Sequence, residues 1–166
     1  MSTNKFIVER TVVGDTNTAL TQASGIDYVD VTGLNWYGKA GEVYKFKATV
    51  VYDVNATGTG ANFSVNGPAA TVISYRSEVP TSATAAAVNY GNAYNLPATP
   101  AQTTGSAAAT DNVAIVEGVI SPSADGTISI RAMVETVASG TCTVQGASSV
   151  LTWSRIDWPE NMSASA

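Results

Sequence analysis

EVYKFKATVVYD, residues 42–53, alternates strictly between apolar and polar side chains over residues 44–50. One side of an extended chain here carries Tyr44, Phe46, Ala48, Val50 and Tyr52. The other side carries Lys45, Lys47, Thr49 and Asp53. Because successive side chains of a β-strand point to opposite faces, this period of two predicts a strand with one buried face and one solvated face. Such a strand is typical of an antiparallel sheet.

Most of the chain shows patterns typical of strands. GTISIRAMVET (126–136) alternates in the same way, whereas VAIVEGVI (113–120) is more continuously apolar and predicts a strand buried on both faces. Further strands are expected in KFIVERTVV (5–13), YVDVTGLNWY (28–37), ANFSV (61–65), AATVISYR (69–76), GTCTVQG (140–146) and SSVLTWSRI (148–156). Several short strands around one core predict an all-β fold, an antiparallel β-sandwich or jelly roll.

The 166 residues fit one domain with appended segments. We expect residues 1–27 to form an N-terminal arm or a leading strand, residues 28–158 to form the sandwich, and residues 159–166 to form a flexible C-terminal tail. Residues 77–112 are rich in Ala, Thr and Pro and predict a long loop, which usually marks a binding loop or disorder. Tyr90 and Tyr94 within it mark either a short extra strand or a contact surface, and both alternatives stay open.

The glycine-rich stretch ATGTGANFSVNGPAATV, residues 56–72, resembles a phosphate-binding loop only superficially. It contains no Gly-Lys-Ser/Thr, and the segment that follows predicts a strand, not a helix whose N-terminus could hold an anion. We therefore interpret Gly58, Gly60 and the Asn66-Gly67-Pro68 sequence as turns between strands.

Composition argues against most catalytic and nucleic-acid functions. Charged residues make up 13% of the chain, about half the usual fraction, and the net charge is −5. The eight Lys and Arg residues are scattered, so no basic stripe for nucleic acid is expected. The chain has no histidine, which removes the commonest general base and transition-metal ligand. The single cysteine, Cys142, is expected to be a small buried hydrophobe.

We accordingly expect no enzyme, and no catalytic residues, metal or cofactor. No stretch is apolar enough for a membrane helix, and the start has no apolar core of a secretory signal. Glu117, inside the most apolar strand, is the carboxylate whose burial could shift its pKa, although an ion pair with Arg131 or Arg155 is the simpler expectation. An esterase or glycosidase activity therefore remains only as a third hypothesis.

Aromatic side chains are the candidates for an interaction surface. The candidate interface residues are Phe6, Trp36, Tyr90, Tyr94 and Trp158. Trp36 and Trp153 lie within expected strands, where core packing is the alternative to surface contact. Trp158 follows the last expected strand and packs either on its own domain or on a neighbouring subunit.

The order of segments resembles a jelly-roll-like module of tailed-bacteriophage virion proteins over residues 28–157. An aromatic-rich strand leads to a Gly-x-x-Phe-x-x-x-Gly-Pro turn, here Gly60, Phe63, Gly67 and Pro68. The Glu-Gly-Val-Ile sequence from Glu117 to Ile120 precedes the strand Gly126–Arg131, and GASSVLTWSRI closes the module with a turn that departs from the usual Gly-Ser.

This resemblance implies a capsid decoration (cement) protein, commonly trimeric, with itself and the major capsid protein as partners and no nucleic acid or membrane. It also implies production in the host cytoplasm and a final location on the outer capsid surface. The alternative is a tail-fibre or baseplate module that binds a receptor or carbohydrate, in which case a host glycan is a partner.

Overall fold

The computed structural model describes residues 9–21, 28–81, 88–93, 106, 108–135 and 140–156, with residues 88–93 described only as backbone. These residues form two antiparallel sheets. The strands are β1 (Arg10–Val13), β2 (Thr18–Thr21), β3 (Val29–Gly38), β4 (Val43–Val54), β5 (Ala61–Asn66), β6 (Ala70–Pro80), β7 (Val88–Ala93), β8 (Asn112–Pro122), β9 (Gly126–Val134), β10 (Thr141–Val144) and β11 (Val150–Ile156). One short 3₁₀ turn, η1 (Gly146–Ser148), precedes β11.

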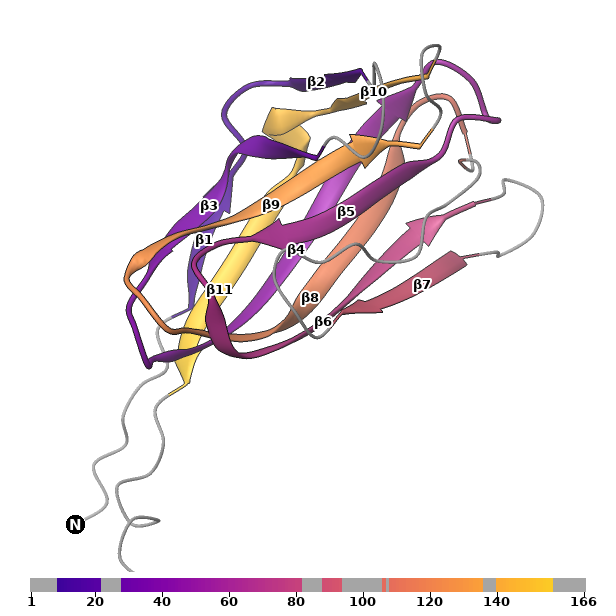
Figure 1. The fold of residues 1–166 in the computed structure, drawn as a ribbon. Coiled ribbons are helices and arrows are strands. Elements are labelled where there is room, and N and C mark those ends of the chain that lie inside the picture. Colours follow the sequence, from indigo (N-terminus) through magenta and orange to yellow (C-terminus); the bar gives the residue numbers. More distant parts are fainter. Residues whose placement is uncertain are drawn as a thin grey trace, which may run out of the picture.

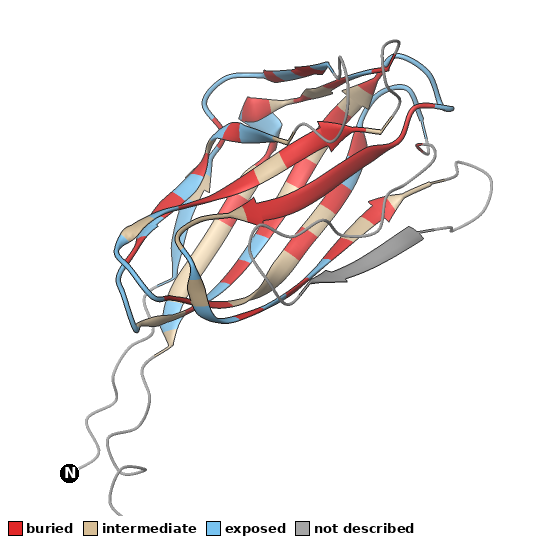
Figure 2. Cartoon of the chain, in the orientation of Figure 1, coloured by how far each residue is buried: buried red, intermediate tan, exposed pale blue. Residues whose placement is uncertain are grey.

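The large sheet has the order β1-β11-β4-β8-β6-β7, and β10 joins β2 to β4 beside this path. The small sheet has the order β3-β9-β5 and lies over the large sheet in front of β11, β4 and β8 (Figure 1). Buried residues concentrate where the two sheets face each other (Figure 2). The predicted all-β antiparallel sandwich is therefore confirmed.

Strand β4 is the centre of the core, as the alternation of residues 42–53 predicted. Tyr44, Phe46, Ala48, Val50 and Tyr52 are buried on its inner face. Trp36 of β3 closes the core from the small sheet: its ring stacks on Trp153 with centroids 6.0 Å apart and lies 5.6 Å from that of Phe46. Aromatic contacts of this kind add to the free energy gained from apolar burial.

A central glycine lets two of these aromatic side chains meet. Gly118 of β8 lies between Phe46 of β4 and Tyr75 of β6 in the register of the sheet. The two rings have centroids 6.4 Å apart. A Cβ atom at Gly118 would overlap the carbonyl oxygen of Ser74 and the Cβ of Tyr75, so this close packing requires a residue without a side chain.

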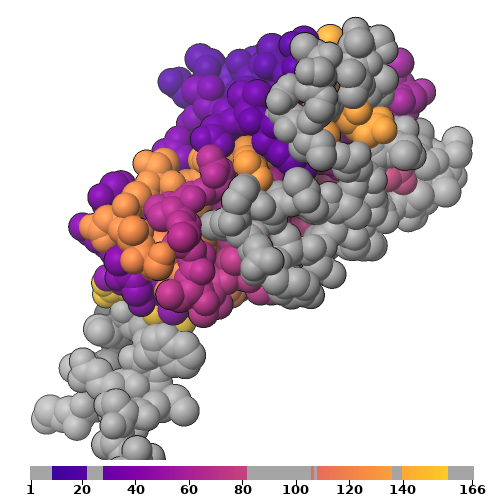
Figure 3. Space-filling view, in the orientation of Figure 1, coloured from indigo at the N-terminus to yellow at the C-terminus, as the bar shows by residue number. Residues whose placement is uncertain are grey.

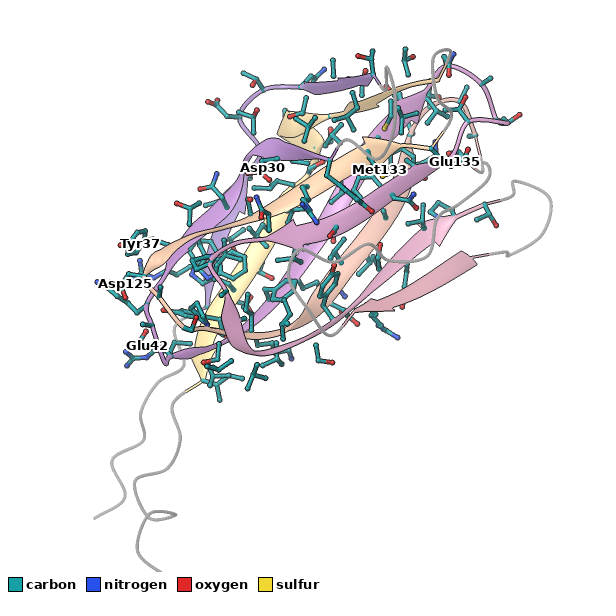
Figure 4. All side chains as sticks on the ribbon, viewed as in Figure 1. Asp30, Tyr37, Glu42, Asp125, Met133 and Glu135 are labelled. Carbon is teal, nitrogen blue, oxygen red and sulfur yellow. The ribbon has the colours of Figure 1, made fainter. Side chains whose placement is uncertain are left out.

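Turns from both sheets meet at one end of the sandwich. The amide of Gly41 donates to the carbonyl of Pro122 (2.8 Å), and the amide of Ser123 donates to the carbonyl of Ala69 (2.7 Å), which joins three turns into one surface (Figure 3). Asp125 accepts hydrogen bonds from Lys39 Nζ and the Ala40 amide, both at 2.9 Å. Tyr37, Glu42 and Asp125 lie at this end, whereas Met133 and Glu135 lie toward the other (Figure 4).

Two sequence expectations about strands were wrong or incomplete. Strand β8 is buried on one face only: Val113 is 47% exposed, and Ile115, Glu117 and Val119 are half-buried. The small sheet covers the inner face of β8 and leaves the outward face open, so a continuous apolar run did not mean burial on both sides. The polar stretch around residues 18–21 contains β2, for which no strand was expected. Within the expected loop of residues 77–112, β7 contains Tyr90, which agrees with the short extra strand that was one of the two alternatives there.

Candidate interaction surface

The outward face of the large sheet is the broadest regular surface among the described residues. It consists of the side chains of β1, β11, β4, β8 and β6 that point away from the small sheet, and we call it the outer face. In Figure 1 it lies on the side away from the viewer. Cross-strand pairing arranges its side chains in rows, since residues opposite each other on neighbouring antiparallel strands have adjacent Cβ atoms.

The outer face is unusually aliphatic for a solvated side of an antiparallel sheet. Val13 is 54% exposed, Val72 50% and Val113 47%, and six other Val and Ile residues are half-buried. Together the aliphatic residues of the outer face are Val13, Val43, Val51, Val72, Val113, Ile115, Val119, Val150 and Ile156. Because exposed clusters of apolar side chains mark contact sites on soluble proteins, this face is our candidate interaction surface.

One row of charges crosses the middle of the outer face. Lys47, Glu117 and Arg76 are opposite one another on β4, β8 and β6. Arg76 donates to Glu117 Oε1 from Nε (2.9 Å) and from Nη2 (2.6 Å), and Lys47 Nζ lies 3.4 Å from Glu117 Oε2. Arg76 Nη2 also lies 2.9 Å from Glu78 Oε1. We call Lys47, Glu117, Arg76 and Glu78 the charged row; it contains two cations and two carboxylates.

The charged row sets the electrostatics of Glu117. Hydrogen bonds from Arg76, aided by Lys47, hold the pKa of the Glu117 carboxyl below its usual value. The expected ion pair with Arg131 or Arg155 is wrong, because those residues lie on β9 of the small sheet and near the end of β11. Burial does not govern Glu117 either, since its side chain points to solvent from the half-exposed face of β8.

Lys45 differs from the other cations of the outer face. Within the described part of the chain it makes no hydrogen bond or ion pair. It borders two open hollows, one of about 370 Å³ lined also by Ser74, Glu117 and Val119, and one of about 110 Å³. The smaller hollow is lined by Glu9, Lys45, Phe46, Lys47, Thr152, Trp153 and Ser154. Lys45 is thus a free charge beside surface that another molecule could occupy.

The small sheet carries a second polar cluster. The Arg131 guanidinium lies 4.5 Å from the centre of the Tyr28 ring and donates to Ser64 Oγ (3.3 Å), which shares a hydrogen bond with the Tyr75 hydroxyl (3.0 Å). Burial raises the pKa of Tyr28 to about 12. The pKa of Tyr75 is also raised by burial. These contacts tie β5 and β9 to β6, which indicates a structural role.

Of the five candidate interface residues, the structure describes the side chain of one. Phe6, Tyr94 and Trp158 lie outside the described residues. Tyr90 is opposite Glu78 on β7, where only the backbone is described. Trp36 is 3% exposed, so of its two alternatives, packing in the core and contact at the surface, the structure shows packing in the core. Trp153 packs against the same core, as expected.

Cys142 is buried, as expected, and burial raises the pKa of its thiol to about 12. Among the described residues no cluster of three or more His, Cys, Asp or Glu side chains could hold a metal ion. No helix in that part of the chain has the length and hydropathy of a membrane span.

Comparisons with known proteins assign no family. No family model matches the chain, and no curated protein matches it. Two similar solved structures are the structure of infectious bursal disease virus Gx strain (TM-score 0.28, 13% identity) and the crystal structure of the infectious bursal disease virus VP2 subviral particle (TM-score 0.26, 10% identity). Each match covers 92% of this chain but only 36% and 37% of those chains. A TM-score below 0.5 does not establish a shared fold, so neither structure assigns a function.

The outer face was not among the predictions from the sequence, which placed the interface on aromatic side chains. The signal was present in residues 43 and 51, where valines interrupt the polar side of β4, and in Val113, Ile115 and Val119 of β8. Aliphatic residues on the predicted solvated side of a strand could have indicated a contact surface.

Proposed function

We propose that this protein is a non-catalytic structural component of a tailed-bacteriophage particle, which binds the outer capsid surface as an oligomer and stabilises the shell. One observation carries the proposal: the outer face is aliphatic, regular and balanced in charge. Such a surface can contact another protein with the charged row already paired, so that Lys45 is the cation that needs a partner from the other molecule. The resemblance of residues 28–157 to virion modules supplies the kind of partner.

Stabilisation of the shell would follow from linkage. A protein that binds the assembled shell and not its separated subunits shifts the equilibrium toward the shell by RT ln(1 + [L]/Kd), about 2.7 kcal/mol per site at a hundredfold excess over Kd. An oligomer multiplies weak contacts into avidity when its subunits reach several capsid subunits at once.

Cryo-EM of purified particles tests the location. We expect density that fits the sandwich on the outside of the shell. Particles that lack the protein should release their genome at lower temperature, and added purified protein should restore the original temperature. Density on a tail fibre, or no effect of added protein on heat stability, would overturn the proposal.

One observation favours the alternative, a receptor- or carbohydrate-binding module. Tyr37 is 60% exposed, with Lys39 Nζ 5.4 Å from its ring centre, and it is the one strongly exposed aromatic among the described side chains. Exposed aromatic faces stack on apolar ligand surfaces. Binding on a glycan array that Tyr37→Ala or Tyr90→Ala abolishes would support the alternative, and absence of binding to glycans and host cells would exclude it.

A further inference from the structure

The outer face is complementary to itself. Consider two copies of the sheet packed face to face and related by a two-fold axis that runs parallel to the strands, midway between two neighbouring antiparallel strands. Each residue of one copy then lies over the residue of the second copy that is its cross-strand neighbour within a single chain. A pair that is complementary within one chain is then complementary again between chains. The neighbours across β4 and β8 include Val51 with Val113 and Lys47 with Glu117.

We propose that the outer face binds a second copy of this chain, with the two-fold axis between β4 and β8. This inference goes beyond the proposed capsid role and does not depend on it: it assigns the outer face to the contact between copies within the oligomer, so that contact with the capsid would fall to the remaining surface. The contact is isologous, so each surface residue is used twice. Two twisted sheets pack face to face at about 10 Å with their strands nearly aligned, as they do inside a sandwich.

The neighbouring rows also match under this symmetry. Strand β11 of one copy comes over β6 of the other, so Ile156 lies near Val72 and Ser154 near Ser74 of the second copy. These positions follow from the register that links β11 to β4 and β8 to β6. Aliphatic contacts would supply most of the free energy of association, because apolar burial scales with the area removed from water.

The charged row would determine register more than affinity. Lys47 of one copy faces Glu117 of the other, while the pairs within each chain persist. Removing charges from water costs free energy even when they are paired. If the two-fold axis lay on β8 instead, Glu117 would face Glu117 and Lys47 would face Arg76 of the second copy. Repulsion between these like charges disfavours that alignment.

Lys45 gives the proposal its sharpest feature. Its cross-strand neighbour is Val119, so the axis between β4 and β8 brings Lys45 over Val119 of the second copy. There the second copy presents the hollow of about 370 Å³ lined by Glu117 and Ser74. Lys45 has no partner among the described residues of its own chain. In the second copy it would meet the Glu117 carboxylate and the Ser74 hydroxyl, beside the Arg76 guanidinium that already pairs with Glu117.

Light scattering on the purified protein over a range of concentrations tests the pairing. From the 17.0 kDa chain we expect a species of 34.0 kDa (2 × 17.0). Lys45→Glu should weaken its formation at least tenfold with unchanged circular dichroism, because the new carboxylate faces Glu117 of the second copy. Lys39→Glu is the matched control: it makes the same change of charge at the end of the sandwich, away from the outer face, and should leave the dimer intact.

A mixing experiment separates contact between copies from effects within one chain. Val119→Lys should also prevent self-association, because the new ammonium group faces Lys45 of the second copy. A 1:1 mixture of the Lys45→Glu and Val119→Lys variants should form heterodimers, since the carboxylate introduced at position 45 of one chain then faces the ammonium group introduced at position 119 of the other. Two variants that stay monomeric alone and also when mixed would contradict this contact.

A monomer at all concentrations would overturn the proposed pairing. The charged row would then serve only to keep the outer face hydrated. A 51.0 kDa trimer (3 × 17.0), or a dimer that tolerates Lys45→Glu, would overturn it too. None of these outcomes depends on whether the wild-type protein binds capsids, which cosedimentation with particles measures separately.

Discussion

The absence of a side chain at Gly118 contributes to stability by letting β6 and β8 pack closely. Gly118 has a negative φ, so its requirement comes from space and not from backbone conformation. We expect Gly118→Ala to lower the free energy of unfolding by about 1–3 kcal/mol, because the new methyl group must displace β6 from β8. Urea denaturation measures the change. Gly58→Ala is the control, since a Cβ atom added there would have no atom within 4 Å, and an equal loss in both variants would contradict this account.

Glu117 should make stability depend on acid pH. Because its pKa is lower in the folded state than its ordinary value of 4.5, its ion pairs stabilise the fold above that value. The contribution is lost as the pH falls through the lowered folded-state pKa. Under conditions where the chain is monomeric, Glu117→Gln should cost about 0.2–1 kcal/mol at pH 7, typical of an exposed pair, and progressively less in acid. Urea titrations at several pH values measure this; a difference that stays constant with pH would contradict it.

For single residues, the sequence predicted burial better than it predicted hydrogen-bond and ion-pair partners. The buried state of Cys142 and the packing of Trp153 followed from their strand context. The partners of Glu117 did not, because Arg76 becomes its neighbour only through the pairing of β6 with β8, which local pattern does not encode. Trp36 was compatible with both core and surface until the position of the small sheet was known.

Among the elements, β1 and β2 are integral parts of the large sheet. Strand β1 pairs with β11, and β2 pairs with β10. Removing residues 1–21 should therefore expose the backbone edge of β11 and cause aggregation, because an unpaired edge recruits other chains. Removing residues 1–8 alone is the control and should leave the circular dichroism unchanged. Sedimentation of both variants measures the difference; soluble, folded protein after the longer deletion would contradict this role.

Sequence predicted the strands with a clear alternating or apolar pattern, long ones such as β4 and β9 as well as the short β10, in which Cys142 and Val144 alternate with threonines. Strand β2 was missed because its four residues, Thr18–Thr21, contain little apolar signal, and its pairing with β10 comes from the tertiary fold. The exposure of β8 was missed because an apolar run carries no information about how many sheets cover it. The outer face is therefore a property of the assembled sandwich.

At the scale of the whole molecule, the two sheets share one hydrophobic core. Unfolding of the monomer should accordingly be a single cooperative transition. Far-UV circular dichroism and the fluorescence of Trp36 and Trp153, which report secondary structure and the packed core respectively, should give the same midpoint in urea. Two separated transitions would mean that one sheet survives without the other.

The pairing of β1 with β11 brings the beginning and the end of the described sandwich together. Arg10 is opposite Trp153, and β11 ends at Ile156 beside Val43. A linker between these ends would be short, so the chain is suited to circular permutation, with new termini opened in the exposed turn at residues 55–58. Cargo fused at such relocated termini would then project from the opposite pole of the sandwich, giving a display scaffold with a choice of two directions.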